Sequence, residues 1–224
     1  MHLSFTNYRK AFGSVEVLKI SDLILESGIY WVKGENGSGK STLLKSIAGI
    51  IDFEGEIKLN GFNSKKKTVD YRKFVNFAEA EPLFPEFLTG KDMVELFAEA
   101  KNATSAQIEF YLITMNMQAY IHEPIGAYSS GMLKKLSLVL AFLGKPQLIL
   151  LDEPLITLDI ESLQILYKWI EKKYTEEGVS FLISSHQALD LAETITRKTL
   201  LVENRTLKMN NADGTYENSL QDIC

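Results

Sequence analysis

The residues best suited to chemistry form a glycine-rich stretch, GENGSGKST, from Gly34 to Thr42. The stretch fits the pattern G-x-x-x-x-G-K-[ST] and lies between a predicted strand and a predicted helix, as that pattern requires. Glycines let the backbone curve tightly and turn its N–H groups inward, where they bind an anion. The start of the following helix adds positive partial charge at the same place. The stretch therefore predicts a site for nucleotide phosphates.

The side chains of this stretch have separate expected roles. We expect the Lys40 ammonium to bind the β- and γ-phosphates, the Ser41 hydroxyl to bind Mg²⁺, and Thr42 to reach an α-phosphate oxygen. Predicted nucleotide contacts are Gly34, Asn36, Gly37, Ser38, Gly39, Lys40, Ser41 and Thr42. The alternative is an ordinary glycine-rich turn before a helix. The pattern alone does not choose between a kinase, a GTPase and a motor.

A second reactive group follows the apolar run in LILLDEP, which predicts a strand buried on both faces. An acid at such a strand end, beside the phosphate site, can hold Mg²⁺ through water, and Asp152 has that position. Glu153 can orient and polarise an attacking water, which indicates hydrolysis rather than phosphate transfer to a metabolite. The competing interpretation is that strands often end in acids because the chain surfaces there.

A histidine ends the next predicted buried strand, VSFLISSH. An imidazole at this place could reach the γ-phosphate and hold the catalytic geometry, so we predict Glu153, His186 and Lys40 as the catalytic residues. A histidine at a strand end is more often structural, and His2 and His122 are given that interpretation.

A third group lies in GAYSSGMLKKLSLVLAFLG, where Ser129, Ser130 and Gly131 come at the start of an apolar helix. Unpaired N–H groups and the positive end of the dipole make a helix start favourable for an anion. A simple N-cap by Ser129 or Ser130 is the alternative. Both can hold, because one serine can cap the helix while the other binds.

The elements that must position these residues alternate in type. The runs EVLKISDLIL, GIYWVKG and GEIKLNG predict strands with tight glycine turns, and one helix follows Lys40. From about Leu88 to Leu143 the spacing turns helical, with TGKDMVELFAEA capped by Thr89 and AQIEFYLITMNM after it.

After Pro146 the strands return. We expect a helix over ESLQILYKWIEKKYTEEG that is closed by Gly178, a helical QALDLAETI, and a final hairpin over KTLLVENRTLKM with Asn204 near its turn. The tail from Asn210 is polar and expected to be loose. Alternating strands and helices predict a parallel sheet flanked by helices, with the helical middle as an insertion.

Composition limits the function classes. The 224 residues, 46% hydrophobic and 24% charged, predict a soluble globular protein with a core of useful size. A net charge of -5 argues against broad attraction to nucleic acid, and the basic run KKK at 65–67 is more simply a solvated loop. The one cysteine, Cys224, excludes an internal disulfide and a zinc cluster, which fits a reducing cytoplasm. The chain shows neither a signal peptide nor about twenty consecutive apolar residues, so we expect no membrane span.

Taken together, the motifs make the chain resemble the nucleotide-binding subunits of ATP-binding cassette (ABC) transporters over nearly its whole length. The resemblance rests on GENGSGKST as Walker A, YSSGM as signature, LILLDEP as Walker B, ITLD as D-loop and SSH as switch histidine, in family order. It implies an α/β fold: a P-loop NTPase with a mostly parallel sheet core, an N-terminal antiparallel β subdomain and an inserted helical subdomain. We expect one ABC ATPase domain over 1–224, with its core in 1–87 and 144–224 and the signature in the insertion 88–143.

The resemblance also implies a mechanism. In this family the signature contacts the γ-phosphate of an ATP that lies in the Walker A loop of the opposite subunit. Ser129, Ser130 and Gly131 would therefore complete the ATP and Mg²⁺ site of a second nucleotide-binding subunit. Binding of ATP would close a homodimer, and hydrolysis would open it. The implied partner is a separate transmembrane permease, not nucleic acid, and the implied place is the cytoplasm, peripheral on the inner face of the cell membrane.

The direction of transport that the resemblance favours is export, because the insertion is short and the signature YSSGM is relaxed from the usual LSGGQ. The transported substrate cannot be read from the chain. Alternatives are an ABC-type ATPase that is not coupled to transport and a poorly hydrolysing module that dimerises on ATP. A small-molecule kinase is disfavoured, because no arginine-rich lid follows the phosphate loop.

Three further positions carry over from the family. Phe12 matches the aromatic that stacks on adenine, with Tyr8 as a competitor and a buried strand aromatic as the alternative. Asp159 resembles the D-loop acid that couples the two sites, or is a helix N-cap. Glu79 takes the place of the family's glutamine, with Glu81 as an alternative alignment. A carboxylate can bind Mg²⁺ or water but cannot donate an amide hydrogen bond.

Overall fold

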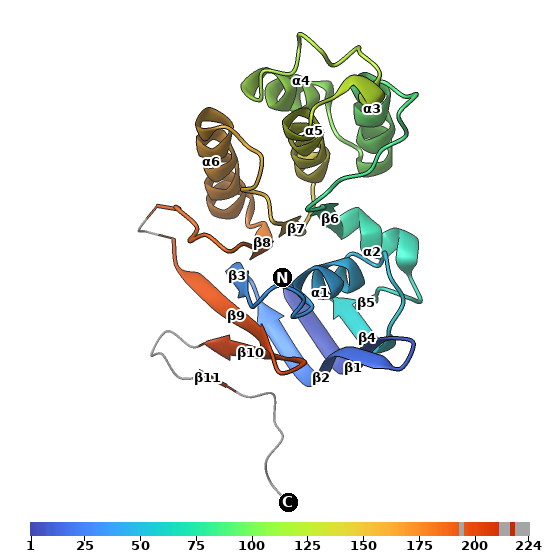
Figure 1. The fold of residues 1–224 in the computed structure, drawn as a ribbon, viewed down its shortest axis with the longest axis vertical. Helices are drawn as coiled ribbons and strands as arrows, with labels where there is room; N and C mark the ends of the chain where they lie inside the picture. Colours follow the sequence, from blue (N-terminus) through green and yellow to red (C-terminus); the bar gives the residue numbers. More distant parts are fainter. Residues whose placement is uncertain (193–194, 211–215, 218–224) are drawn as a thin grey trace, which may run out of the picture.

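The structure, a computed structural model, describes residues 1–192, 195–210 and 216–217. Its strands form two sheets, which Figure 1 shows below the main group of helices. The smaller sheet is antiparallel, has the order β2-β1-β4-β5, and contains β1 (His2–Phe12), β2 (Val15–Glu26), β4 (Glu54–Leu59) and β5 (Phe62–Asn63). This sheet is the N-terminal antiparallel part that the sequence predicts.

The larger sheet has the order β11-β10-β9-β3-β8-β7-β6. Its parallel part consists of β9 (Arg197–Glu203), β3 (Ile29–Lys33), β8 (Ser180–Ser184), β7 (Leu148–Asp152) and β6 (Val75–Ala78). The edge strands β10 (Thr206–Asn210) and β11 (Tyr216–Glu217) run antiparallel. A mostly parallel core sheet is therefore confirmed. The predicted reactive residues lie at or just after the carboxyl ends of β3, β7 and β8. Because these strands are parallel, their carboxyl ends lie on the same side of the sheet, and the reactive residues gather there.

The strands β7 and β8 are interior strands of the larger sheet, and every residue in them is buried. Successive side chains of β7 enter two different cores: Leu148 and Leu150 belong to one and Ile149 and Leu151 to the other. Burial on both faces is the reason that these strands are continuous apolar runs rather than alternating ones.

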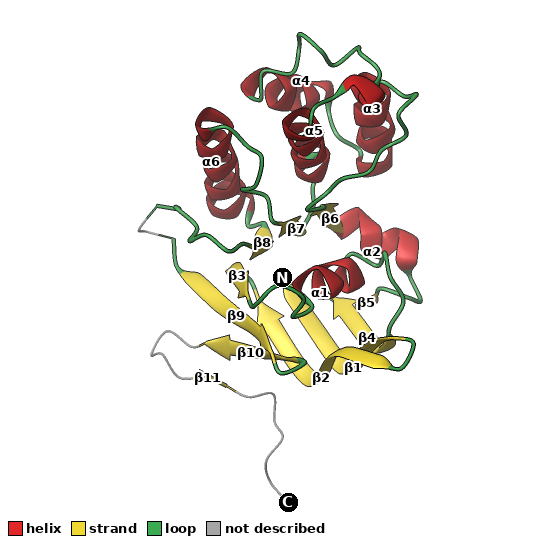
Figure 2. Ribbon diagram, viewed as in Figure 1, coloured by secondary structure: helices red, strands yellow, loops and turns green. Residues whose placement is uncertain are grey.

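The helices gather mainly at one end of the molecule, as Figure 2 shows for α3, α4, α5 and α6. Their bounds are α1 (Lys40–Ile47), α2 (Thr68–Phe74), α3 (Gly90–Lys101), α4 (Ser105–Thr114), α5 (Ser130–Phe142) and α6 (Ile160–Glu177), with a 3₁₀ turn at Ile125–Ala127. The predicted capping residues are confirmed: the Thr89 side chain accepts a hydrogen bond from Asp92 N, and Gly178 closes α6 in the left-handed conformation.

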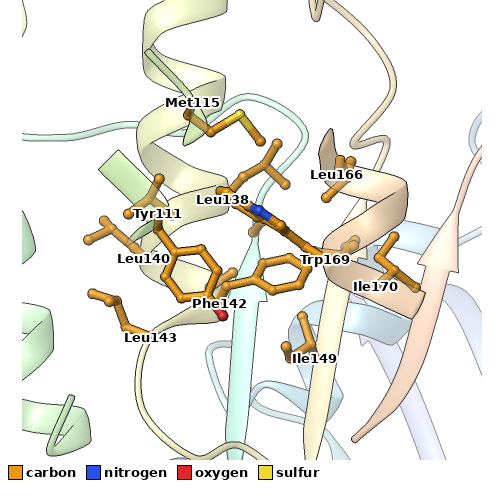
Figure 3. Packing of buried hydrophobic residues seen from close by; sticks show 14 of the residues in the cluster. Tyr111, Met115, Leu138, Leu140, Phe142, Leu143, Ile149, Leu166, Trp169 and Ile170 are labelled. Atoms are coloured by element: carbon orange, nitrogen blue, oxygen red, sulfur yellow. The ribbon is translucent and has the colours of Figure 1, made fainter. Parts of the chain in front are cut away.

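The helical middle shares its core with the rest of the chain (Figure 3). Tyr111 of α4 and Phe142 of α5 contact Trp169 of α6, with ring centroids 4.5 Å and 5.2 Å from the indole. The helices α3 to α5 fall inside the range 88–143, and the division of the domain at these boundaries stays a prediction. None of the helices in the described ranges has the length and apolar character that crossing a membrane requires.

Two sequence expectations are wrong. QALDLAETI is not helical over 187–192, and 193–194 lie outside the described residues. Leu189 and Leu191 are both buried, a spacing of two that suits an extended chain, and the Ala192 N–H binds the Glu171 carboxylate of α6 instead of a preceding carbonyl. The helix over AQIEFYLITMNM ends at Thr114, three residues early.

The helix α2 is not predicted by the sequence pattern. The KKK run at 65–67 directly precedes it and is exposed, as expected of a solvated stretch. The final hairpin is confirmed, and Asn204 and Arg205 both have positive φ in its two-residue turn. Most of the tail that begins at Asn210, including Cys224, lies outside the described residues.

Candidate active site

The glycine-rich loop connects β3 to α1 and packs closely against β9. Gly34 and Gly39 have φ of 156° and 109°, and a Cβ on Gly34 would lie 2.5 Å from the Val202 carbonyl oxygen. The Lys40 side chain is only 7% exposed, and its ammonium donates hydrogen bonds to the carbonyls of Gly34 (2.9 Å) and Glu35 (3.0 Å). The loop therefore encloses its own cation at the start of a helix, which is the arrangement that binds phosphate.

A pocket of about 880 Å³ opens at this loop. Six of the eight predicted nucleotide contacts line it: Asn36, Gly37, Gly39, Lys40, Ser41 and Thr42. Glu153, His186 and Ser130 line the same pocket from three other parts of the chain. The fold thus brings the phosphate loop, the acid after β7, the histidine after β8 and the start of α5 around one cavity.

The acid Asp152 ends β7 and is 1% exposed. Its Oδ1 accepts a hydrogen bond of 2.6 Å from the Ser184 hydroxyl of β8, and the same hydroxyl accepts one from Glu153 N at 2.9 Å. Ser184 therefore connects the ends of the two neighbouring strands. No group of three or more His, Cys, Asp or Glu side chains in the described ranges could hold a metal by itself. A Mg²⁺ ion held with ATP needs only one or two protein carboxylates, so Asp152 and Ser41 still fit it.

The acid Glu153 has a strained backbone, with φ of 43°. Its Oε1 is buried and makes no hydrogen bond, and His186 Nε2 lies 3.4 Å from it without hydrogen-bond geometry. A buried, unpaired carboxylate oxygen beside an imidazole can accept a hydrogen bond from a water molecule in the pocket. This geometry suits the activation of water.

The two serines at the start of α5 make different contacts. Ser129 is the N-cap, because its hydroxyl accepts a hydrogen bond from Met132 N, and Ser130 lines the pocket. Gly131 allows a close approach within the chain itself, since a Cβ there would lie 3.2 Å from the Thr157 carbonyl oxygen. Capping by Ser129 is therefore confirmed, and the binding of a phosphate by Ser130 stays a prediction.

The acid Asp159 is the N-cap of α6, as one of the two interpretations of the sequence predicts. It accepts hydrogen bonds from Ser162 N and Ser162 Oγ, and Lys135 of α5 lies 3.0 Å away. Its pKa is lowered from 3.8 to about 2, mainly by the Ser162 N–H and then by Lys135. Its role between two subunits stays a prediction.

The position of Glu79 differs from the expectation of a metal ligand. Its carboxylate lies 3.2 Å from Lys45 Nζ of α1, and Glu79 lines a neighbouring groove rather than the pocket. Glu81, the alternative alignment, does line the pocket. The ion pair with Lys45 draws the Glu79 carboxylate toward α1, which the sequence pattern could not reveal.

Of the two aromatic candidates for adenine, Tyr8 is fully buried, and its hydroxyl is 2.8 Å from Ser46 Oγ of α1. This contact makes Tyr8 a core residue. Phe12 is 54% exposed at the end of β1, and the Lys10 ammonium lies 4.5 Å from its ring centroid. Phe12 is not in the pocket lining but remains free to stack.

Sequence reasoning missed Lys134 and Thr157, which also line the pocket. A signal for Lys134 existed: it follows Ser130 by four residues on one helix, so both side chains share a face. No comparable signal marks Thr157, because its position depends on the loop that leads from β7 to α6.

The family whose description is ABC transporter matches residues 19–156, a range that includes the phosphate loop, the start of α5 and the end of β7. The chain belongs to the ABC transporter family. As a member of this family it is an ATP-binding protein and an ATP hydrolase. The pocket described above is the place where the family's nucleotide chemistry is expected.

Relatives cover nearly the whole chain. The uncharacterized ABC transporter ATP-binding protein YdbJ of Bacillus subtilis is 26% identical over 221 residues, which are 96% of this chain and 71% of YdbJ. The spermidine/putrescine import ATP-binding protein PotA of Fusobacterium nucleatum is 25% identical over 220 residues, 96% of this chain and 58% of PotA. An import protein among the relatives means that membership in the family does not decide the direction of transport.

Solved structures share the fold. An ATP-binding subunit of an ABC transporter has a TM-score of 0.84 at 24% identity, covering 95% of this chain and 91% of its own. An ATP-binding cassette captured as a dimer after hydrolysis, with ADP and phosphate bound, has a TM-score of 0.79 at 18% identity, covering 98% and 100%. These similarities confirm the P-loop NTPase architecture.

Proposed function

We propose that this ABC cassette works as a pair of identical chains, hydrolyses ATP with Mg²⁺ in the pocket at Lys40, and thereby drives export by a separate membrane protein. The observation that carries the proposal is the convergence of Lys40, Glu153 and His186 on one cavity. A site with a phosphate loop alone would support binding. The unpaired Glu153 oxygen adds the means to activate water.

Each residue of the pocket then has a role. Lys40 and the loop N–H groups bind the β- and γ-phosphates, while Ser41 and Asp152 would hold Mg²⁺. Mg²⁺ bound with ATP would neutralise charge on the phosphate oxygens. Glu153 accepts a proton from the attacking water, and His186 orients the Glu153 carboxylate at the γ-phosphate end.

Pairing of two chains is supported by what surrounds the pocket. Ile156, in the pocket lining, and Ile160, the first residue of α6, are exposed large apolar side chains in the loop after β7 and the helix start that it leads to. A second copy that covers this loop would bury them and bring its own α5 start to the γ-phosphate. The structural neighbour that was captured as a dimer with ADP and phosphate gives a precedent for this assembly.

A groove beside the pocket is the proposed dock for the membrane partner. It measures about 760 Å³ and lies between α2, β6, α3 and α5, with the exposed apolar residues Ile50, Val69 and Leu83 and the bases Arg72 and Lys73 in its lining. We propose that a short cytoplasmic helix of the permease binds here, with an apolar face and an acidic residue. Binding would place this cassette in the cytoplasm, at the inner face of the membrane.

Export is the finer part of the proposal, and its support is the short helical middle and the relaxed signature YSSGM. The test is reconstitution with the permease in vesicles, with ATP supplied to the side that carries the cassette. Loss of cargo from that side is expected for export. Accumulation of cargo on that side would mean import, as in the relative PotA.

Glu153→Gln tests ATP-dependent pairing. The amide keeps the shape of the side chain but cannot take a proton from water, so ATP should remain bound and hold two chains together. Size-exclusion chromatography with ATP and Mg²⁺ is expected to show a dimer that reverts to monomer without nucleotide. The double variant Lys40→Ala/Glu153→Gln is the control and should stay monomeric. A Glu153→Gln protein that binds ATP yet elutes as a monomer would contradict the pairing.

A further inference from the structure

A short segment after β6 separates the nucleotide pocket from the groove. We call residues 79–83 the partition segment. Ala80 and Glu81 line the pocket, Glu79 lines the groove, and Pro82 and Leu83 line both cavities. Any shift of this segment therefore changes the shape of both cavities at once.

The segment is held by a buried lysine of α5, the helix that Figure 1 shows next to β6. The Lys134 ammonium donates hydrogen bonds to the carbonyls of Ala80 (2.6 Å) and Glu79 (2.9 Å). Lys134 is 2% exposed, although a lysine is seldom buried without a specific partner. Two charge-assisted bonds to consecutive carbonyls fix both the position and the orientation of the peptide between them.

Three carboxylates interact electrostatically with the same ammonium. Burial lowers the pKa of Lys134 to about 8, and the negative charges of Asp152, Glu153 and Glu81 act against this by favouring the protonated form. The Lys134 ammonium therefore bonds to the backbone of the partition segment and also interacts electrostatically with Glu81 and Glu153, which line the pocket. Lys134 also lines that pocket.

We propose that Lys134 is a positioning residue for ATP hydrolysis, which fixes the partition segment against the nucleotide pocket from the signature helix α5. The proposal rests on ATP turnover in this pocket, the function proposed above. Lys134 acts through the segment, whose residues Ala80 and Glu81 line the pocket. Its loss should therefore slow turnover more than it weakens ATP binding.

A second lysine supplies a matched comparison. Lys101 of α3 donates to the carbonyl of Val75 (3.0 Å), the first residue of β6, and to that of Arg72 in α2 just before it, and burial lowers its pKa to about 8 as well. Lys101 and Lys134 thus each attach the helical middle to one end of β6. Of these two lysines, only Lys134 lines the nucleotide pocket.

The test compares Lys134→Met with Lys101→Met by steady-state ATP hydrolysis and thermal unfolding of the full chain. Both variants should lower Tm by several degrees, because each leaves two backbone carbonyls unpaired. For Lys134→Met we expect kcat to fall at least about tenfold while KM for ATP changes less than about threefold. For Lys101→Met we expect kcat within about twofold of wild type. Lys134→Gln, which keeps two N–H donors without the charge, should recover part of the lost kcat.

Equal losses of kcat in the two Met variants would overturn the proposal, because Lys134 would then only stabilise the fold. Unchanged kcat in Lys134→Met would overturn it too. If either Met variant does not fold, Lys134→Gln and Lys101→Gln are compared by the same criterion. Wild-type protein without ATP turnover would instead overturn the proposed function, so the two failures are distinguishable.

Discussion

At the scale of single residues, the loop after β7 contains two strained positions. Glu153 and Thr157 have φ of 43° and 69°, and a β-branched residue such as Thr rarely adopts positive φ. Such strain costs about 1–3 kcal/mol per residue and persists where surrounding contacts fix the chain. Here Glu153 N donates to Ser184 Oγ, which anchors the loop to β8.

The strain at Thr157 predicts that Thr157→Gly stabilises the fold. Glycine adopts positive φ without the steric penalty, so we expect the free energy of unfolding to rise by about 1 kcal/mol. ATP turnover should fall, because a looser loop positions Glu153 less well. Urea denaturation and steady-state hydrolysis measure the two effects. A Thr157→Gly protein that is less stable than wild type would show that Thr157 makes contacts that outweigh its strain.

The capping carboxylate Asp159 predicts a dependence of stability on pH. Its folded pKa of about 2 is below its ordinary value of 3.8, so the ionised form stabilises the fold above about pH 4. This contribution should be lost as the pH falls from about 4 to about 2. At pH 7, Asp159→Ala should lower the free energy of unfolding by about 1 kcal/mol through loss of the N-cap.

Urea denaturation of wild type and Asp159→Ala across this pH range measures the effect. The difference between the two proteins should shrink below pH 4. Asp159→Asn, which keeps a capping oxygen but no charge, should lie between them at pH 7. A difference that does not change with pH would show that the charge of Asp159 contributes nothing.

At the scale of elements, the start of α5 serves the helix, the pocket and a neighbouring loop together. Ser129 caps the helix, Ser130 lines the pocket, and Gly131 lets the Thr157 carbonyl approach. The helix continues with Lys134 and Lys135, which contact the partition segment and Asp159. One helix therefore touches the loops on two sides of the pocket.

The close approach at Gly131 predicts that Gly131→Ala moves the loop that carries Glu153. A Cβ 3.2 Å from the Thr157 carbonyl forces a shift of a few tenths of an ångström. We expect ATP turnover to fall several-fold while circular dichroism shows an intact fold. Gly126→Ala is the control, because its Cβ would lie equally close, 3.2 Å, to the Glu86 side chain outside the pocket. Equal turnover in both variants would contradict the prediction.

At the scale of the whole molecule, the larger sheet and the helical middle share one hydrophobic core, and the two cavities share one wall. The core that contains Tyr111, Phe142 and Trp169 also contains Ile149 of β7. The pocket and the groove meet at the partition segment, so a ligand in one cavity contacts the wall of the other. This arrangement is suited to transmitting a change at the nucleotide to a partner in the groove.

The proposed dock predicts that a charge in the groove disrupts the complex with the permease. Val69 is 73% exposed on α2 and lines the groove, so Val69→Asp places an unpaired charge where an apolar helix face is expected. Detergent-solubilised permease should co-purify with wild type but not with Val69→Asp. The control is Ile24→Asp, at an exposed apolar position of β2 outside the groove. Normal co-purification of the Val69 variant would contradict docking at this groove.

The sequence by itself determined the features that depend on local pattern. GENGSGKST between a strand and a helix, Thr89 at a helix start, and the continuous apolar run before Asp152 each have physical causes within a few residues. The structure places all of these elements as expected. QALDLAETI failed because Leu189 and Leu191 are buried by distant elements, which overrides the local helical pattern.

The tertiary structure alone decided which side chains meet. Glu79 pairs with Lys45 rather than facing the pocket, and Lys134 binds Glu79 and Ala80 across a separation of more than fifty residues. Sequence spacing fixes the face of a helix on which a side chain lies. The partner on that face depends on how helices pack on the sheet, and that packing is set by burial of apolar surface from the whole chain.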